Sequence, residues 1–370
     1  MNEPQTFYDF YDYEIKSTSK KKLEEEIKGY PGLVLYPMVT QDFVGIEVEI
    51  EDTPYSLSAS YLWGSHEDGS LRNNGNEYIS SPIYGKYIGY ALQILKHKLE
   101  KRNNYSFSER TSVHIHLNIR DMSVDSFCNF MLIYFLLETL LFHYVDSKGT
   151  SRVNNVFCHS LKDSKGFSCF ELLKSFFTKE MKQEEIARFL YSLINHWPKY
   201  TALNLACIRN LGTVEFRHMG GNLDIPYLID WINIILRIKQ SALNLKYEEL
   251  IKTIYEVNTT SYYEATLIDI LGPQMPLLYP YVNHAEMEET ITKIKELIGA
   301  VKNERISKVL KEFVSGKSKL AKYYTPNLLK PPKKGIPDID MQFMEMENQQ
   351  AQPLAEEYSW NPPIIADENI

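Results

Sequence analysis

The chain has 370 residues, of which 44% are apolar and 13% aromatic, enough to bury a sizeable core in one large domain or two smaller ones. This composition excludes a disordered chain, and the formal net charge of −8 gives no electrostatic argument for nucleic-acid binding. Residues 326–370 alone contribute −5, so the acidic balance says little about a site elsewhere.

The cysteines and the N-terminus predict a reducing, cytoplasmic location without a signal peptide. Cys128, Cys158, Cys169 and Cys207 contain no CxxC pair, and the first residues lack a basic and an apolar region. The most apolar stretch, residues 130–145, is too short to span a bilayer and contains two polar ionisable residues, so we expect a buried helix and no membrane contact.

Apolar periodicity, caps and turn residues predict the secondary structure in chain order. We expect helices at residues 20–28, 82–101, 124–145, 170–179, 183–196 and 226–243, with a helical pattern from there to about 324. We expect strands at residues 33–36, 44–51, 55–62, 77–80, 113–119, 200–207 and 213–218, with a turn-rich stretch at 64–75 and a hairpin turn at 209–212.

The order of these elements favours an α+β fold. Strands occur as neighbouring hairpins and as pairs separated by helices, without steady βαβ alternation, so we expect a mostly antiparallel sheet with helices on one face and the site on the other. We divide the chain into a catalytic domain at 1–325, including a helical extension from about 244, and a Pro-rich acidic flexible tail at 326–370.

The first polar strand, GIEVEIE, places Glu47, Glu49 and Glu51 on one face and apolar side chains on the other. Three like charges repel each other unless a cation lies among them, and Mg²⁺ prefers carboxylate oxygens. The alternative is a solvated face of an amphipathic strand, which this pattern alone leaves open.

Two later strands repeat the alternation with other polar groups. SVHIHLN places His114, His116 and Asn118 on one face, as in a metal or phosphate site or a merely polar sheet surface. TVEFRH places Glu215 beside Arg217, which could hold a metal and a phosphoryl oxygen together or form a surface ion pair.

Four further residues are candidates outside these rows. Glu77 begins a short strand, and Asn204 alternates with two leucines, so both could face a ligand. Arg152 could reach a phosphate or a substrate carboxylate, or be an ordinary surface arginine. Glu138 lies in an apolar run, where a carboxylate is costly unless it is paired.

Read in order, these segments resemble the amidoligase family, which belongs to the glutamine synthetase-like carboxylate–amine ligases. The matching motifs, which span about residues 40–240, are GIEVEI at 45–50, DGSL at 68–71 with NEYISSP at 76–82, VHIH at 113–116, RVNNVFC at 152–158, YTALNL at 200–205 and GTVEFR at 212–217. Asp224 and Trp231 fit the closing helix of the family. Residues 109–112 depart from it, because they lack the Cys-Gly that many relatives carry there.

The resemblance implies ATP-dependent amide-bond formation through an acyl phosphate, with Mg²⁺ neutralising the triphosphate. The resemblance assigns metal binding to Glu47, Glu49, Glu77, Glu215 and His114. It assigns binding of phosphoryl oxygens to Arg217, positioning of the nucleotide or substrate to Asn204, and a contact with phosphate or metal to His116. It assigns catalytic roles to Arg217, Glu215 and Arg152.

Two other classes of function remain open from the sequence. One is a catalytically inactive amidoligase-like protein used for binding or structure in a phage-like assembly, with the tail contacting a protein partner. The other is a metal-dependent hydrolase, in which water replaces the amine. The sequence does not identify the carboxylate or amine, which could be small molecules or peptides, and it leaves a homo-oligomer open.

Overall fold

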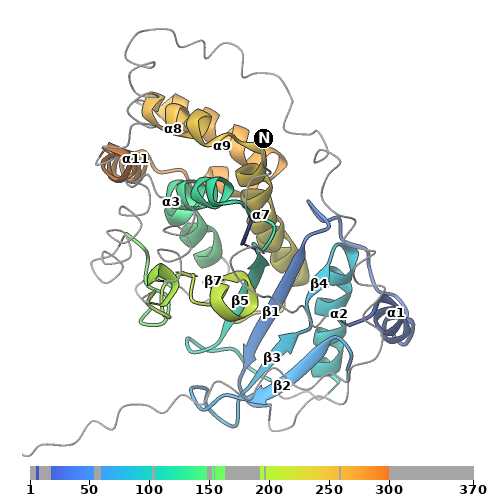
Figure 1. Cartoon of the computed structure of the whole chain (residues 1–370). Helices are drawn as coiled ribbons and strands as arrows, with labels where there is room; N and C mark the ends of the chain where they lie inside the picture. The colour runs from blue at the N-terminus through green and yellow to red at the C-terminus, as the bar shows by residue number, and fades with distance from the viewer. Residues whose placement is uncertain are drawn as a thin grey trace, which may run out of the picture.

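The computed structural model describes residues 6–7, 18–53, 60–101, 105–147, 152–153, 155–162, 192–195, 197–257 and 260–299. In these ranges one antiparallel sheet has the strand order β2-β3-β1-β5-β7-β6, with β4 also paired to β1 (Figure 1). The strands are β1 (Phe43–Ile50), β2 (Trp63–Glu67), β3 (Asn76–Ser80), β4 (Ile83–Tyr84), β5 (Ser112–Asn118), β6 (Leu203–Asn204) and β7 (Thr213–Gly220).

Three of the helices begin where the sequence supplies a capping side chain. Ser19, Ser123 and Asp224 each accept a hydrogen bond from a backbone N–H of the first helical turn. The helices are α1 (Lys20–Lys28), α2 (Lys86–Glu100), α3 (Val124–Asp146), α6 (Ile208–Leu211), α7 (Ile225–Asn244), α8 (Tyr247–Glu256), α9 (Thr260–Leu271), α10 (Met275–Leu278) and α11 (His284–Gly299).

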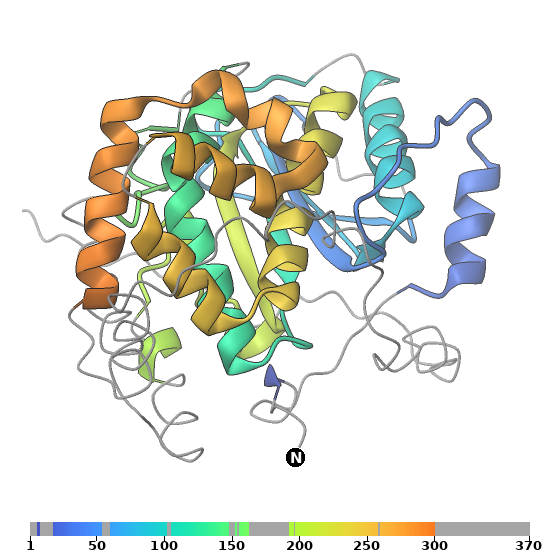
Figure 2. The ribbon, with the colours of Figure 1, turned by 90° about the horizontal axis from the view of Figure 1, so that it is seen from above.

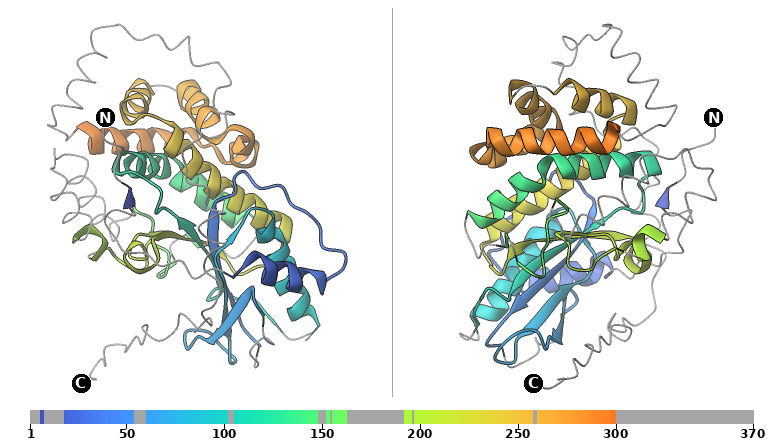
Figure 3. Two further views of the ribbon diagram at one scale, coloured as in Figure 1. Left: turned by 45° about the vertical axis from the view of Figure 1, so that its right-hand side comes forward. Right: turned by 90° about the vertical axis from the view of Figure 1, so that its left-hand side faces the viewer.

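The helices cover one face of the sheet in two layers. Helices α3 and α7 pack against β5 and β7, and α8, α9 and α11 pack over them (Figures 2 and 3). The alternate strand residues that face this side, among them Val48, Ile115 and Phe216, are fully buried. The predicted α+β class with helices on one face is therefore confirmed, and the polar alternate residues are left on the opposite face.

Helix α3 is the one helix among the described residues that is long and apolar enough to cross a membrane, but 78% of its most apolar window is buried inside the protein. Its one internal carboxylate, Glu138, is fully buried and accepts hydrogen bonds from Tyr134 (3.0 Å), Ser160 (2.8 Å) and the Leu161 N–H (2.7 Å). These bonds offset the cost of burying the carboxylate, so α3 is the buried helix that the sequence predicts.

Several predicted elements differ in the structure. Residues 33–36 form no strand, because the Gln93 side chain bonds both the N–H and the C=O of Val34, at 2.8 Å each, in place of a neighbouring strand. Residues 63–67, expected to be mostly turn, form β2 because they pair with β3. The helix expected from residue 82 begins at Lys86, after Ile83–Tyr84 has paired with β1.

The predicted hairpin at residues 200–218 is shorter than expected. Of the predicted strand at 200–207, Leu203–Asn204 is the part that forms strand β6 and pairs with β7. Ile208–Leu211 forms a short helix that ends at Gly212 in the left-handed region (φ 63°). The predicted strand at 55–62 lies mostly outside the described residues, and residues 60–62 form no strand. The predicted helix at 170–179, most of that at 183–196, and everything after 299 lie outside them as well.

Candidate active site

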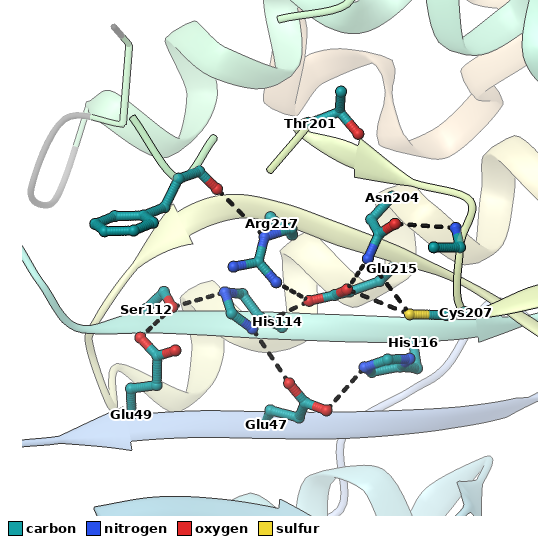
Figure 4. Close-up of polar contacts among 12 residues, drawn as sticks. Glu47, Glu49, Ser112, His114, His116, Thr201, Asn204, Cys207, Glu215 and Arg217 are labelled. Atoms are coloured by element: carbon teal, nitrogen blue, oxygen red, sulfur yellow. Dashed lines mark hydrogen bonds and ion pairs between the residues drawn. The ribbon is translucent and has the colours of Figure 1, made fainter. Parts of the chain in front are cut away.

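The sheet face opposite the helices gathers polar side chains from five strands. They are Glu77 on β3, Glu47 and Glu49 on β1, His114 and His116 on β5, Glu215 and Arg217 on β7, and Asn204 on β6. The strand register places Glu47 beside His114, Glu49 beside Glu77, and Glu215 beside both His116 and Asn204. Figure 4 shows all of them except Glu77 gathered on this face, between β1 and β6.

Glu47 lies between the two histidines. Its Oε2 is 3.2 Å from His114 Nδ1, and its Oε1 is 2.9 Å from His116 Nε2. Burial by itself would raise the pKa of Glu47, but His116 and His114 outweigh it and hold the pKa well below its usual value. Burial would likewise lower the pKa of His116, but the Glu47 carboxylate raises it well above the usual value. Glu47 and His116 therefore form a charged pair.

Glu215 is the most highly coordinated carboxylate of the site. Its Oε1 lies 3.2 Å from His114 Nδ1 and pairs closely with Arg217 Nη1. Its Oε2 accepts a hydrogen bond from Asn204 Nδ2 (2.7 Å) and lies 3.4 Å from the Cys207 sulfur. Burial opposes ionisation, but Arg217 and the histidines outweigh burial and lower the pKa of Glu215 to about 2.

A β-bulge interrupts β7 next to Arg217. Val113 pairs with Met219 and Ile115 with Phe216, so two steps on β5 oppose three on β7. Arg217 shares the face of Glu215 by alternation, and its Nε donates to the Phe157 carbonyl oxygen (3.3 Å). His218 instead turns to the helical side, 3.0 Å from the Tyr134 hydroxyl.

Negative charge dominates the end of the site that contains Glu49 and Glu77. The Ser112 hydroxyl donates to Glu49 and lies 2.7 Å from His114 Nε2. Glu77 faces Glu49 across the strand pair, and burial together with Glu47, Glu49 and Asp68 raises the pKa of Glu77 to about 9. A bound cation would relieve this repulsion.

Three overlapping groups on this face could hold a metal ion, each with its ligand atoms within 4.8 Å of one another. They are Glu49, Glu77 and His114; Glu47, His114 and Glu215; and His116, Cys207 and Glu215. The first two offer mostly carboxylate oxygens, the donors that Mg²⁺ prefers, so the predicted metal residues fit this ion. Cys207 was not predicted as a site residue, because its only local signal in the sequence is its position three residues after Asn204.

Arg152 lies with a different set of neighbours. It is 1% exposed. Burial raises the pKa of the Cys158 thiol and the Arg152 guanidinium opposes this shift, whereas burial and Arg152 together lower the pKa of His218. The Nε and Nη1 atoms of Arg152 have no hydrogen-bond partner among the described residues. The Arg217 guanidinium also acts to lower the pKa of Cys158, so both arginines lie near the same thiol. The role of Arg152 in binding phosphate remains a prediction.

Glu51 and Asn118, which belong to the polar strand rows, bond residues outside the site. Glu51 accepts the backbone N–H of Arg72 (2.9 Å) and supports the turn before β3. Asn118 donates to Asp42 (3.0 Å) and accepts from Arg120 (2.7 Å). Both lie at strand ends, where loops supply backbone and side-chain partners.

Replacing Glu77 by glutamine is expected to stabilise the metal-free protein at alkaline pH. A carboxyl group whose pKa is raised on folding contributes stability below its unfolded pKa of 4.5, and this stability is lost as pH rises toward about 9. Glutamine stays neutral, so at pH 8.5 the variant should gain about 1–3 kcal/mol in unfolding free energy, and nothing at pH 4.5.

Urea unfolding in a chelator at both pH values measures this difference. Added Mg²⁺ should stabilise the parent protein more than the variant and so narrow the gap. A difference that is the same at both pH values would contradict the electrostatic explanation.

Comparison with known proteins finds a family match for the middle of the chain. Residues 65–239 match a family described as "Putative amidoligase enzyme", and the resemblance seen in the sequence is confirmed over this segment. The match includes Glu77, His114, Asn204, Glu215 and Arg217.

Among solved structures, the chain matches one described as "Crystal structure of novel glutamine synthase homolog", with 10% identity and a TM-score of 0.31, over 80% of this chain and 74% of that one. No curated protein matches the chain.

Proposed function

We propose that this protein is an ATP- and Mg²⁺-dependent ligase that joins a carboxylate to an amine. The observation that carries the proposal is the gathering of four carboxylates, two imidazoles and Arg217 on one sheet face, most of it within the amidoligase-family segment. Such a face suits phosphoryl transfer, which needs charge neutralisation and positioning more than covalent catalysis by the protein.

The proposed reaction has two steps. A carboxylate oxygen of the substrate takes the γ-phosphoryl group of ATP, which gives an acyl phosphate and ADP. The amine nitrogen then attacks the acyl carbon, the C–O bond to phosphate breaks, and the amine loses a proton as the amide forms. Candidate substrates are small molecules or peptides that carry the carboxylate and the amine.

The residues divide into two groups by charge. Glu47, Glu49, Glu77, Glu215 and His114 would hold Mg²⁺, which when bound neutralises phosphate charge. Arg217 is held between Glu215 and the Phe157 carbonyl, so its guanidinium is oriented to pair with phosphoryl oxygens beside the metal ligands.

The neighbours of the metal ligands have supporting roles. Asn204 donates to Glu215 Oε2 and so fixes the direction in which this carboxylate points. The proposed contacts of Asn204 and His116 with nucleotide, phosphate or substrate would add to the contacts that these residues make within the site. Arg152 would bind phosphate through its Nε and Nη1 groups, which have no hydrogen-bond partner among the described residues.

Calorimetric titration of the purified full-length protein with a non-hydrolysable ATP analogue, with and without Mg²⁺, tests the proposal without knowledge of the substrates. Binding that requires Mg²⁺ is the expected result, and no binding by a folded sample would refute it. A screen of carboxylate and amine pairs then separates a ligase from a hydrolase, because a ligase yields a joined product by mass spectrometry and a hydrolase yields only free phosphate.

A further inference from the structure

Cys207 adds a sulfur atom to an otherwise oxygen- and nitrogen-rich site. It lies in the connection between β6 and β7, at the start of α6, and its sulfur is 3.4 Å from Glu215 Oε2 and 3.5 Å from Asn204 Nδ2. Figure 4 shows the thiol approaching Glu215 from the side of His116. Unlike Cys128 and Cys158, which are buried, Cys207 is partly exposed, so an ion could reach it.

We propose that His116, Cys207 and Glu215 form a second cation site, selective for a thiophilic divalent ion of the Zn²⁺ class rather than for Mg²⁺. Their ligand atoms already lie within 4.8 Å of one another. Around a tetrahedral Zn²⁺ with bonds of about 2.0–2.3 Å, ligand atoms are roughly 3.3–3.8 Å apart, so only a small closure is required. Thiolate, imidazole and carboxylate with one open position is a donor set typical of Zn²⁺.

Glu215 would connect this site to the magnesium-type ligands. Its Oε1 faces His114, whereas its Oε2 faces Cys207, so the two oxygens point to different groups of ligands. A carboxylate in this position can bridge two cations, or the two cations can compete for it as a ligand. Binding of a thiophilic ion, which displaces the Cys207 thiol proton and one imidazolium proton of His116 to solvent, would therefore alter the affinity of the site for Mg²⁺.

Titration of the full-length protein with Co²⁺ as a spectroscopic probe for Zn²⁺ tests the inference without any substrate. A cobalt–thiolate bond gives a charge-transfer absorption band in the near ultraviolet. We expect this band in the parent protein and in the control Cys128→Ser, which changes a buried thiol on α3. In Cys207→Ser we expect the band to disappear and the Co²⁺ dissociation constant to rise about tenfold or more. No band in the parent, or a band that survives in Cys207→Ser, would overturn the proposal.

A second measurement on the parent protein avoids dependence on the folding of a variant. Alkylation of Cys207 by iodoacetamide, followed by peptide mass spectrometry, should slow about tenfold or more with stoichiometric Zn²⁺ and stay unchanged with Mg²⁺. Equal alkylation rates with and without Zn²⁺ would refute the site. The inference is independent of the ligase proposal, since a protein that binds Co²⁺ through Cys207 but binds no nucleotide would refute only the latter.

Discussion

The variant Glu215→Gln is expected to lose Mg²⁺-dependent binding of an ATP analogue and, once a substrate pair is known, its turnover. Glu215 connects His114, Arg217 and Asn204, and it belongs to two of the three candidate metal groups. Glutamine keeps the shape but replaces one charged oxygen by an NH₂ group, which cannot ligate Mg²⁺ and would face Arg217 or Asn204 as a second donor. We expect the calorimetric dissociation constant with Mg²⁺ to rise about 100-fold or more.

The control is Glu67→Gln, which makes the same chemical change at the exposed end of β2 in the same sheet and should bind as the parent does. Circular dichroism and urea unfolding of both variants separate a folded, inactive protein from an unfolded one. The double variant Glu47→Gln/Glu215→Gln provides the strictest test. If it retains Mg²⁺-dependent binding, the metal ligands have been assigned wrongly.

The variant Lys239→Met is expected to lose about 3–5 kcal/mol of unfolding free energy. The Lys239 ammonium group on α7 is 1% exposed, lies 2.7 Å from Asp121 Oδ1 and pairs closely with Asp42. Burial opposes its charge, but the two carboxylates outweigh burial and raise the pKa of Lys239. Methionine would fill the same space and leave two carboxylates close together without their cation.

Urea unfolding at neutral pH measures this loss, and Lys246→Met is the matched control. Lys246 follows the end of α7, its side chain is 76% exposed, and its ion pair with Glu249 is on the surface, so we expect a change within about 0.5 kcal/mol. A loss below about 1 kcal/mol for Lys239→Met would show that the buried ion cluster contributes little to holding α7 against the loops that carry Asp42 and Asp121. Unfolding at acidic pH adds a check. Burial raises the pKa of Asp42, and protonation of this carboxylate should reduce the difference in unfolding free energy between parent and variant.

The sequence by itself determined which side chains share a face, because the period of two in a strand is a local property of the backbone. Glu47 with Glu49, His114 with His116, and Glu215 with Arg217 follow from alternation alone. The capped helices α1, α3 and α7 follow similarly from Ser19, Ser123 and Asp224, since a cap acts within one helical turn.

Only the tertiary structure decided which rows became neighbours. The order β3-β1-β5-β7-β6 arises from burying the apolar faces under α3 and α7, and it brings Glu215 to His114 across about 100 residues of chain. The bulge at Arg217, the approach of Cys207 to Glu215, and the bonding of Val34 by Gln93 depend on partners far away in the sequence. No local pattern encodes such partners, because long-range packing selects among many segments with similar local preferences.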